Sequence, residues 1–561
     1  MVTNNSSLIL CLVTHKILLN FCATPARRRH ACASQNVSHT FCAPGGIRTP
    51  NNCFEGRHDI HFTTRACYDC AMQLRPSQIP ADVSRITKTF EDAGFEAWIV
   101  GGCVRDLLLG RKPKDWDITT NATPEQIQGL FENTFYSNDF GTVGIVTDDA
   151  ADESLKVVEA TPYRVEGKYS DARRPDSVIF SQNIEDDLRR RDFTINALAY
   201  NTKGELLDFY GGIKDIDAGL IRAVGVATER FDEDALRILR AVRISAELDF
   251  AIEASTKAAM QQCGNQLAKI SKERVRDEFA RIIGSQKPMP ALILARELGI
   301  LQYIAPDIEK GLGVEQNQAH SFDVLEHNLR SLQHAADKDW SFDIRLSALF
   351  HDVGKPASRR WSDEKHDWTF HGHDVVGAKI TKKALENLKF SRETVEKATK
   401  MVRWHMFFSD PDKVTLSAVR RIIANVGREN IEDLVKLRIC DRIGTGRPKE
   451  QPFRLRKYQA MIDQALRDPI SVAMLKIDGK RLMDVTGEKP GPRLGWLLHA
   501  LLEEVLDDPE RNTTEYLDTK AKEFAKLTDA DLKSKGQEAK ERKEQAEQAD
   551  LDEINKKYFV N

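Results

Sequence analysis

The sequence predicts an α+β domain followed by a series of helical domains. Between about 78 and 212, short apolar runs that suit buried strands alternate with short helical segments. From about 213 onward the apolar residues follow a helical spacing, and no apolar run is long enough to cross a bilayer. A chain of 561 residues is too long for one hydrophobic core. We therefore expect an α+β head, an all-α neck and body, a helical bundle and a helical tail.

Composition fits a globular protein without a membrane partner. Hydrophobic residues make up 41% of the chain and charged residues 30%, and the formal net charge is −3. Such a charge gives no general attraction to nucleic acid, so any RNA-binding surface must be local. Arg173, Arg174 and the basic residues between 269 and 276 are candidates for it, although they suit a solvated helix face equally well. The three dispersed cysteines after residue 71 predict a reducing, cytoplasmic location. Nothing in the sequence predicts an oligomeric state.

The head begins with a strand that leads into a glycine pair. Phe95 to Val100 is a mostly apolar run typical of a buried strand, and Gly101 and Gly102 follow it directly. Glycines let a backbone approach a ligand closely. The helix expected over 104–109 would then present its N-terminal N–H groups to an anion. This turn predicts contact with a phosphate.

Two aspartates follow a few residues later. Asp115 and Asp117 stand at positions i and i+2, so a strand over 115–119 would place both carboxylates on one face. Carboxylate oxygens in that arrangement suit Mg²⁺ bound to a triphosphate. An isolated Asp-x-Asp pair is more often a solvated turn. The glycine turn directly upstream favours a phosphate-handling site instead.

A pair of aspartates has no positive charge to bind phosphate oxygens, and two arginine-rich segments supply it. Arg189 to Arg191 form a cluster whose guanidinium groups suit phosphate oxygens, and the nearby Asp192 or Asn196 suits a ribose hydroxyl.

In the second segment, Asp234, Arg237 and Arg240 share one face of an expected helix. An exposed acid–arginine pair explains this spacing about as well. A carboxylate beside a guanidinium group is also what reading the edge of a base requires.

These motifs resemble the bacterial class II tRNA nucleotidyltransferases, the CCA-adding enzymes of the polymerase-β-like nucleotidyltransferase superfamily. The resemblance covers about residues 78 to 500, and the motifs occur in the family's order. They are GGCVRD with DWD, RRDF with TINAL, DFYGG, EDALRILR and SKERVRDE. An ordered set of this kind is far more specific than any single motif.

The resemblance implies template-independent addition of CCA to tRNA, with CTP and ATP as substrates and Mg²⁺ in the head. The RNA 3′-hydroxyl would attack the α-phosphate, and pyrophosphate would leave. Asp115 and Asp117 would be catalytic and hold the metal, and Asp234 with Arg237 would select the base. Glu159, inside an apolar run, is a candidate third carboxylate, although an edge-strand glutamate facing water is about as plausible. The nucleotide would contact Gly101, Gly102, Arg105, Arg191, Asp192, Asp234, Arg237 and Arg240.

A second set of residues, rich in histidine and aspartate, lies in the helical region. A lone His–Asp doublet is usually structural, but here the doublet sits in an apolar helical segment and other helices supply further histidines or aspartates. The surroundings of the doublet resemble the HD phosphohydrolase domain. The expected ligands of a divalent metal (Mg²⁺, Mn²⁺, Ni²⁺ or Co²⁺) are His327, His351, Asp352, His373, His405 and Asp441, with Lys355 and His371 nearby.

The remaining parts of the chain carry no expected chemistry. Residues 1–71 hold many cysteines and no sustained helix or strand period, which favours a non-native or disordered extension with Met72 as the true initiator. The polar segment 166–176 is expected to be a mobile loop. The expected domains are the head at 78–212, neck and body at 213–315, HD domain at 316–460, helical tail domain at 461–527 and charged tail at 528–561.

Three other interpretations compete with full CCA addition. A poly(A) polymerase of the same superfamily would share the head motifs, but residues 138–145 resemble the CCA-adding form. An enzyme that adds only A remains open, whereas the loop at 166–176 resembles an element that CC-only enzymes lack. The chain could instead be an HD-type phosphohydrolase or an RNA-binding protein with an inactive head. The intact acidic and basic residues of the head argue against this last alternative.

Overall fold

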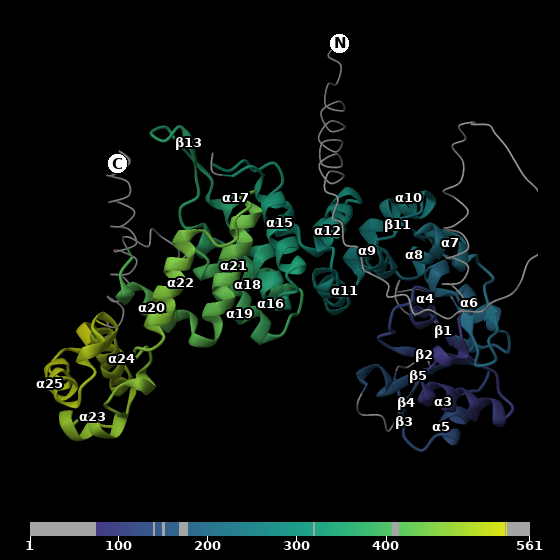
Figure 1. The fold of residues 1–561 in the computed structure, drawn as a ribbon, viewed down its shortest axis with the longest axis horizontal. Coiled ribbons are helices and arrows are strands. Elements are labelled where there is room, and N and C mark those ends of the chain that lie inside the picture. The colour runs from purple at the N-terminus through teal and green to yellow at the C-terminus, as the bar shows by residue number, and fades with distance from the viewer. Residues whose placement is uncertain are drawn as a thin grey trace, which may run out of the picture. The chain divides into compact units, whose positions relative to one another are not determined.

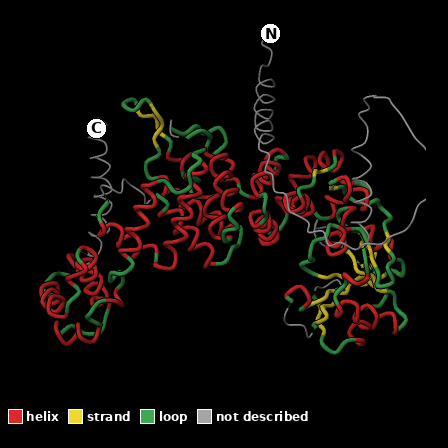
Figure 2. Tube along the Cα trace, in the orientation of Figure 1, coloured by secondary structure: helices red, strands yellow, loops and turns green. Residues whose placement is uncertain are grey.

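The computed structural model describes most of the chain after residue 73. The residues that it describes are 74–137, 141–147, 152–167, 178–317, 320–406, 414–532 and 535. The expected extension at 1–71, most of the expected loop at 166–176 and most of the charged tail lie outside them. Within this described part, every helix is too short or too polar to cross a membrane. Figure 2 shows most of the strands gathered in the head, whereas the described residues after the head are nearly all in helices and loops.

A seven-stranded mixed sheet forms the centre of the head (Figure 1). Strands β2 and β5 pair in parallel, and the other neighbours are antiparallel. The α+β head is therefore confirmed. In spatial order the strands are β3 (Thr134–Tyr136), β4 (Val143–Val146), β5 (Val157–Pro162), β2 (Trp116–Thr120), β1 (Ala97–Val100), β8 (Ala199–Tyr200) and β9 (Leu206–Leu207).

The register of the central strands places the predicted acidic residues side by side. Asp117 on β2 is paired with Val100 on β1 and with Glu159 on β5. Alternate residues of β2, such as Ile118, are fully buried in the core. The helices of the head are α3 (Ala81–Asp92), α4 (Gly102–Leu108), α5 (Pro124–Leu130) and α6 (Ile184–Arg189), with a separate hairpin of β6 (Arg164–Glu166) and β7 (Val178–Phe180).

The neck and body are helical, as predicted, apart from one short parallel pair of strands, β10 (Leu220–Ile221) and β11 (Ala251–Ile252). Helix α9 buries Ile238, Leu239 and Val242 in the core and packs against α11. The helices are α7 (Gly212–Ala218), α8 (Ala227–Glu233), α9 (Leu236–Leu248), α10 (Ala254–Cys263), α11 (Lys272–Gly284), α12 (Pro288–Glu297), α13 (Leu301–Ile304) and α14 (Pro306–Glu309).

The next helices form the bundle that carries the histidine set. The sequence predicted helices alone here, but a two-stranded hairpin, β12 (Arg360–Ser362) and β13 (Asp367–Thr369), lies between α17 and α18. Its cross-strand pair Trp361 and Trp368 stabilises a strand pairing that helical periodicity does not reveal. The helices are α15 (Val324–Asp337), α16 (Phe342–Phe350), α17 (Lys355–Ser358), α18 (His373–Asn387), α19 (Arg392–Trp404), α20 (Leu416–Val426) and α21 (Ile431–Gly444).

The last described helices share a second hydrophobic core with α20 and α21. The predicted break at residues 488–492 falls between α23 and α24. These helices are α22 (Phe453–Ala465), α23 (Gly479–Thr486), α24 (Pro492–Asp507) and α25 (Thr514–Phe524). Short 3₁₀ turns occur at Pro76–Gln78, Glu153–Leu155, Thr194–Asn196, Gly264–Lys269, Arg428–Asn430, Val472–Met474 and Pro509–Arg511.

Candidate functional site

Two of the three predicted carboxylates of the head stand next to each other on the sheet, and the third precedes them. Asp117 lies on β2 beside Glu159 on β5, and Asp115 comes directly before the strand, which begins at Trp116. Burial, followed by the charge of Asp115, raises the pKa of Asp117 to about 7, and Glu159 adds to the rise. This mutual repulsion is what a bound divalent cation relieves, so the donor set fits Mg²⁺. Ser137 donates a hydrogen bond of 2.7 Å to Glu159.

The glycine turn lies against this acidic edge. Gly101 has a φ of +86°, a conformation that favours glycine. A Cβ atom at Gly101 would stand 3.0 Å from Nη1 of Arg191 and 3.5 Å from Oδ2 of Asp117. The backbone, a carboxylate and a guanidinium group therefore converge on one point. Helix α4 begins at Gly102, two residues earlier than predicted.

A chain of polar contacts joins three segments that are distant in the sequence. Arg105 on α4 donates from Nη1 to Oδ1 of Asn196 at 2.7 Å, and the amide of Asn196 donates to Oδ1 of Asp192 at 3.0 Å. Oδ2 of Asp192 pairs with Nη2 of Arg240 on α9 at 2.9 Å. The structure thus brings together four residues that the sequence analysis had assigned to the nucleotide or its ribose.

Asp187, which the sequence analysis missed, anchors the arginine cluster. It is fully buried, and its carboxylate pairs with Arg190 at 2.5 Å and with Arg191 at 3.0 Å. Burial alone would raise the pKa of Asp187, but the two guanidinium groups outweigh it and lower the pKa below its usual value. The sequence did contain an indication of this role. Asp187 precedes Arg190 by three residues and Arg191 by four, the spacings at which side chains of a helix meet.

The expected side-by-side arrangement of Asp234 and Arg237 is not what the structure shows. Helix α9 begins at Leu236, so Asp234 precedes it and does not share its face. Both carboxylate oxygens of Asp234 instead accept hydrogen bonds from Arg274 on α11, at 3.2 and 2.6 Å. Arg237 donates to Glu233 at 2.5 Å and to the carbonyl oxygen of Arg190 at 3.0 Å. The predicted helical spacing was wrong because Asp234 lies in extended backbone between α8 and α9, where Leu236 N–H donates to its carboxylate.

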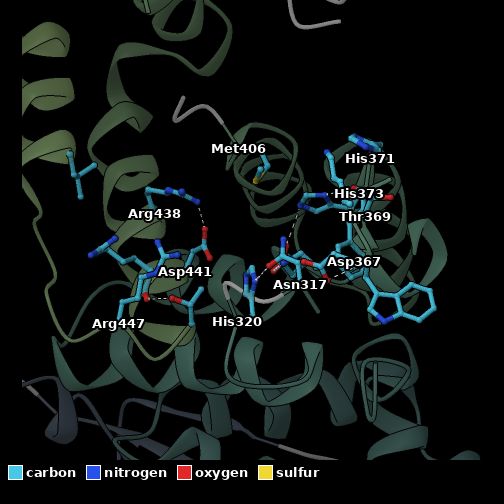
Figure 3. Close-up of a pocket in the computed structure, with 18 of the residues that line it drawn as sticks. Asn317, His320, Asp367, Thr369, His371, His373, Met406, Arg438, Asp441 and Arg447 are labelled. Carbon is cyan, nitrogen blue, oxygen red and sulfur yellow. Dashed lines mark hydrogen bonds and ion pairs between the residues drawn. The ribbon is translucent and has the colours of Figure 1, made fainter. Parts of the chain in front are cut away.

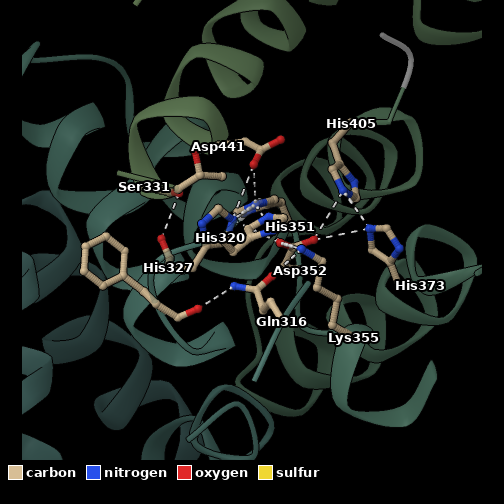
Figure 4. Close-up of polar contacts among 12 residues, drawn as sticks. Gln316, His320, His327, Ser331, His351, Asp352, Lys355, His373, His405 and Asp441 are labelled. Carbon is tan, nitrogen blue, oxygen red and sulfur yellow. Dashed lines mark hydrogen bonds and ion pairs between the residues drawn. The ribbon is translucent and has the colours of Figure 1, made fainter. Parts of the chain in front are cut away.

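The predicted histidine and aspartate ligands meet in the core of the bundle, and all six are buried (Figure 4). They form two groups, in each of which all the ligand atoms lie within 4.8 Å of one another. The first group is His327, His351, Asp352 and Asp441; the second is Asp352, His373 and His405. Among the described residues, the head carboxylates form no group this close.

Asp352 belongs to both groups through different oxygens. Its Oδ2 lies 3.0 Å from Nε2 of His327, and its Oδ1 lies 3.3 Å from Nε2 of His373 and 3.5 Å from Nε2 of His405. Lys355 pairs with the same Oδ2 at 2.6 Å. Asp352 could therefore supply a ligand oxygen to a divalent ion held by either group.

Three of the histidines are oriented as metal ligands are. His351, His373 and His405 each place Nδ1 within 2.8 Å of a backbone carbonyl oxygen. Because a carbonyl oxygen only accepts, Nδ1 carries the proton and Nε2 faces the cluster. Burial lowers the pKa of His351, but Asp352 and Asp441 outweigh it and raise that pKa to about 10. Such a dense set of buried acids and imidazoles fits divalent cations.

Known proteins show the same order of parts. Family models match at residues 97–222 (Poly A polymerase head domain), 249–312 (Probable RNA and SrmB- binding site of polymerase A) and 324–445 (HD domain). The CCA-adding enzyme of Lactobacillus delbrueckii subsp. bulgaricus is 33% identical over 78% of this chain and 97% of that relative. The one from Limosilactobacillus reuteri is 31% identical over 81% of this chain and the whole of that relative.

This chain belongs to the CCA-adding enzymes. It is therefore a tRNA nucleotidyltransferase, the class of enzyme that uses CTP and ATP. The crystal structure of the Bacillus stearothermophilus CCA-adding enzyme in complex with CTP has a similar fold, with a TM-score of 0.58 and 27% identity. That match covers 80% of this chain and 97% of that one.

This CCA-adding enzyme has a cavity of about 490 Å³ at the cluster of its HD bundle (Figure 3). Asp352, His373 and Asp441 from the cluster line it, as do Lys355 and His371, the two residues predicted to be nearby. The sequence analysis missed the other lining groups, which come from the hairpin, from the loop at His320 and from α21 and the residues after it. The sequence did contain an indication of this wall, because residues 359–371 hold several aromatic and basic side chains.

Proposed function

We propose that the head completes tRNA 3′ ends with CCA, using Asp115 and Asp117 to hold Mg²⁺ and Glu159 as a third carboxylate beside them. The convergence of Gly101, Asp117 and Arg191 supports this assignment. Bound Mg²⁺ would activate the RNA 3′-hydroxyl and neutralise charge on the leaving pyrophosphate. Arg191 and Arg240 bind the triphosphate, while Asp192 and Asn196 orient the ribose. Arg105, held by Asn196, fixes the turn that faces the nucleotide.

Base selection is assigned to Asp234 and Arg237, with Arg274 as a positioning residue. Arg274 holds both oxygens of Asp234, so the carboxylate is presented in one orientation. Arg237 is held by Glu233 and by the carbonyl oxygen of Arg190. Replacing Arg237 by Ala should relax the preference for C and A over U and G, since one bidentate contact contributes roughly 1–3 kcal/mol of discrimination. Unchanged selectivity across all four triphosphates would rule out this assignment.

One experiment separates full CCA addition from the alternatives. A tRNA transcript lacking CCA is incubated with CTP, with ATP and with both, beside a transcript that ends in CC. For full CCA addition, the transcript lacking CCA should receive two C residues with CTP alone and a final A only when both nucleotides are present, and the transcript ending in CC should receive A with ATP alone. An A-adding enzyme would extend only the transcript ending in CC, and a poly(A) polymerase would add long A tails with ATP alone. No incorporation under any condition would mean an inactive head.

The HD bundle is proposed to be a separate metal-dependent phosphohydrolase. Its support is the pair of ligand groups that share Asp352. A divalent ion bound there (Mg²⁺, Mn²⁺, Ni²⁺ or Co²⁺) would lower the pKa of a water molecule towards neutrality. The substrates would be 2′,3′-cyclic phosphates or phosphomonoesters at damaged RNA ends. The test is hydrolysis of a 2′,3′-cyclic nucleotide with each metal in turn, and absence of hydrolysis with every metal would reduce the bundle to a scaffold.

We also propose that the enzyme acts in the cytoplasm. Cys103, Cys263 and Cys440 are free and buried, as expected for a protein of a reducing compartment.

A further inference from the structure

The cavity of the HD bundle has two walls of different chemistry, and the cluster of buried histidines and aspartates lies between them. In Figure 3, Arg438 and Arg447 lie on one side, and Asp367, Thr369 and His371 lie on the other. Its volume of about 490 Å³ is within the roughly 300–1,000 Å³ of small-molecule sites. A metal-bound phosphate needs only a small part of this space. The remaining space is large enough for another part of a substrate.

The first wall carries three arginines, Arg438, Arg442 and Arg447, on α21 and the turn after it. All three side chains line the cavity. Arg438 is paired with Asp441 of the cluster. Arg442 donates from Nε to the carbonyl oxygen of Lys449 at 2.6 Å, which orients its planar guanidinium group. Clustered guanidinium groups at a cavity suit phosphate oxygens.

The second wall is aromatic and comes from the hairpin of β12 and β13 and the residue after it. Trp368 on β13 and Phe370 just after it line the cavity. The indole of Trp368 is held by two neighbours: the guanidinium carbon of Arg359 lies 3.6 Å from its ring centre, and Trp361 meets it edge to face at 5.1 Å. A side chain held in this way is a rigid platform. Flat aromatic surfaces beside a phosphate site suit a nucleobase.

We propose that Trp368 and the arginine wall make this cavity specific for a nucleotide unit, with the base against Trp368 and the phosphate between the cluster and Arg442 and Arg447. The inference rests on the proposed phosphohydrolase function and adds the residues that choose its substrate. The shared chemistry is a nucleoside that carries a phosphate on its ribose, as in the 2′,3′-cyclic phosphates of the proposed function. Its source is either a free nucleotide or the 3′ end of an RNA. Phosphomonoesters without a base are poor substrates.

The first test compares a nucleoside 2′,3′-cyclic phosphate with glycerol 2-phosphate, which has no base. Trp368→Ala should raise KM for the nucleotide roughly tenfold, the effect expected for loss of one stacking contact. It should leave glycerol 2-phosphate hydrolysis unchanged, which shows that the bundle is still folded. Trp368→Phe, which keeps an aromatic face, should restore most of the loss. Equal effects of Trp368→Ala on both substrates, or no effect on the nucleotide, would overturn the proposal.

The arginine wall has its own variant. Arg442→Gln should raise KM for both substrates, because both carry the phosphate, whereas an effect on neither would overturn its assignment. A short RNA ending in a 2′,3′-cyclic phosphate is compared with the free cyclic nucleotide. A higher kcat/KM for the RNA identifies the RNA end as the source, and equal values identify the terminal nucleotide alone. With either result, Trp368→Ala must still raise KM for the nucleotide substrate.

A binding measurement tests the role of Trp368 even if the bundle hydrolyses nothing. A nucleoside 2′-monophosphate is titrated calorimetrically into the full chain and into the Trp368→Ala variant with Mn²⁺ present. Weaker binding by the variant supports the platform even when the wild type hydrolyses nothing. Binding at the head is the same in both proteins and cancels in the comparison. Equal affinity in the two proteins would overturn the inference while leaving hydrolysis intact.

Discussion

Asp117 shows how several weak features combine at one residue. Its side chain lies beside Glu159 on the next strand, near Asp115 and against the glycine turn, and its pKa is raised to about 7. Carboxylates held this close repel one another unless a cation or a guanidinium group compensates. Arg191 supplies part of that compensation. The charges of these residues matter more for function here than for packing.

Replacing Asp115 or Asp117 by Ala should abolish nucleotide incorporation while leaving the fold largely intact, because each change removes an oxygen ligand from the metal site. The measurement is incorporation of labelled CTP into a tRNA that lacks CCA. Asp92→Ala, an exposed aspartate at the end of α3, is the matched control and should retain activity. Near-normal incorporation by either site variant would show that the metal assignment is wrong.

Replacing Asp187 by Asn should destabilise the head and weaken nucleotide binding, because Arg190 and Arg191 lose a buried partner. Breaking a buried ion pair in this way costs about 3–5 kcal/mol. The pKa of Asp187 is lowered in the folded state, so its stabilisation is complete above the unfolded value of 3.8. The difference between wild type and variant should therefore shrink as pH falls below that value. Hydrogen exchange of head peptides at several pH values measures it, and a constant difference would contradict the ion-pair explanation.

At the scale of elements, helix α11 connects the proposed nucleotide site to the bundle. Arg274 near its beginning holds Asp234, and Arg345 of α16 binds the carbonyl oxygens at its end. Arg345 is only 4% exposed, and it donates to Gly284 at 2.8 Å and to Ser285 at 2.9 Å. A buried guanidinium group at this helix end satisfies carbonyls that have no partner within the helix.

Replacing Arg345 by Met should lower the thermal stability of the bundle and neck. Each buried carbonyl left without a donor costs about 1–3 kcal/mol, and methionine fills much of the space without donating. The measurement is the unfolding temperature by calorimetry. Arg392→Met removes an exposed arginine that pairs with Glu396 within one helix and should change this temperature little. Equal effects of the two changes would contradict the capping role of Arg345.

At the scale of the whole molecule, two chemical sites are built from separate elements. The head site uses β2, β5, α4 and α9, while the cluster uses α15, α18, α21 and the residues just after α16 and α19. The two sets share no residue. Their activities should therefore separate by mutation.

The double variant His351→Ala, Asp352→Ala should lose phosphohydrolase activity and keep CCA addition. Both residues belong to the first ligand group, and Asp352 also belongs to the second. Hydrolysis of a cyclic nucleotide is measured beside CTP and ATP incorporation. His499→Ala, an exposed histidine on α24, is the control and should change neither activity. Loss of both activities in the double variant would indicate a structural role for the cluster.

Local patterns were enough to predict the fold class, and they also supplied the candidate residues of both sites. The strand before Gly101, the spacing of Asp115 and Asp117, and the His351–Asp352 doublet are all features of a few consecutive residues. Backbone geometry acts over the same short range, so a strand or a glycine turn can be inferred from its own residues. The resemblance to the nucleotidyltransferase family rests on these same short segments.

By itself, then, the sequence determined which residues are candidates for the chemistry, and the tertiary structure decided which of them contact one another. Asp234 takes Arg274 as its partner, 40 residues away, rather than Arg237 on the adjoining helix. Asp352 joins two ligand groups, and the hairpin with Trp368 forms one wall of a cavity. Such pairings depend on how helices and strands pack. Packing energy is spread over many side chains, so no single segment of the sequence encodes it.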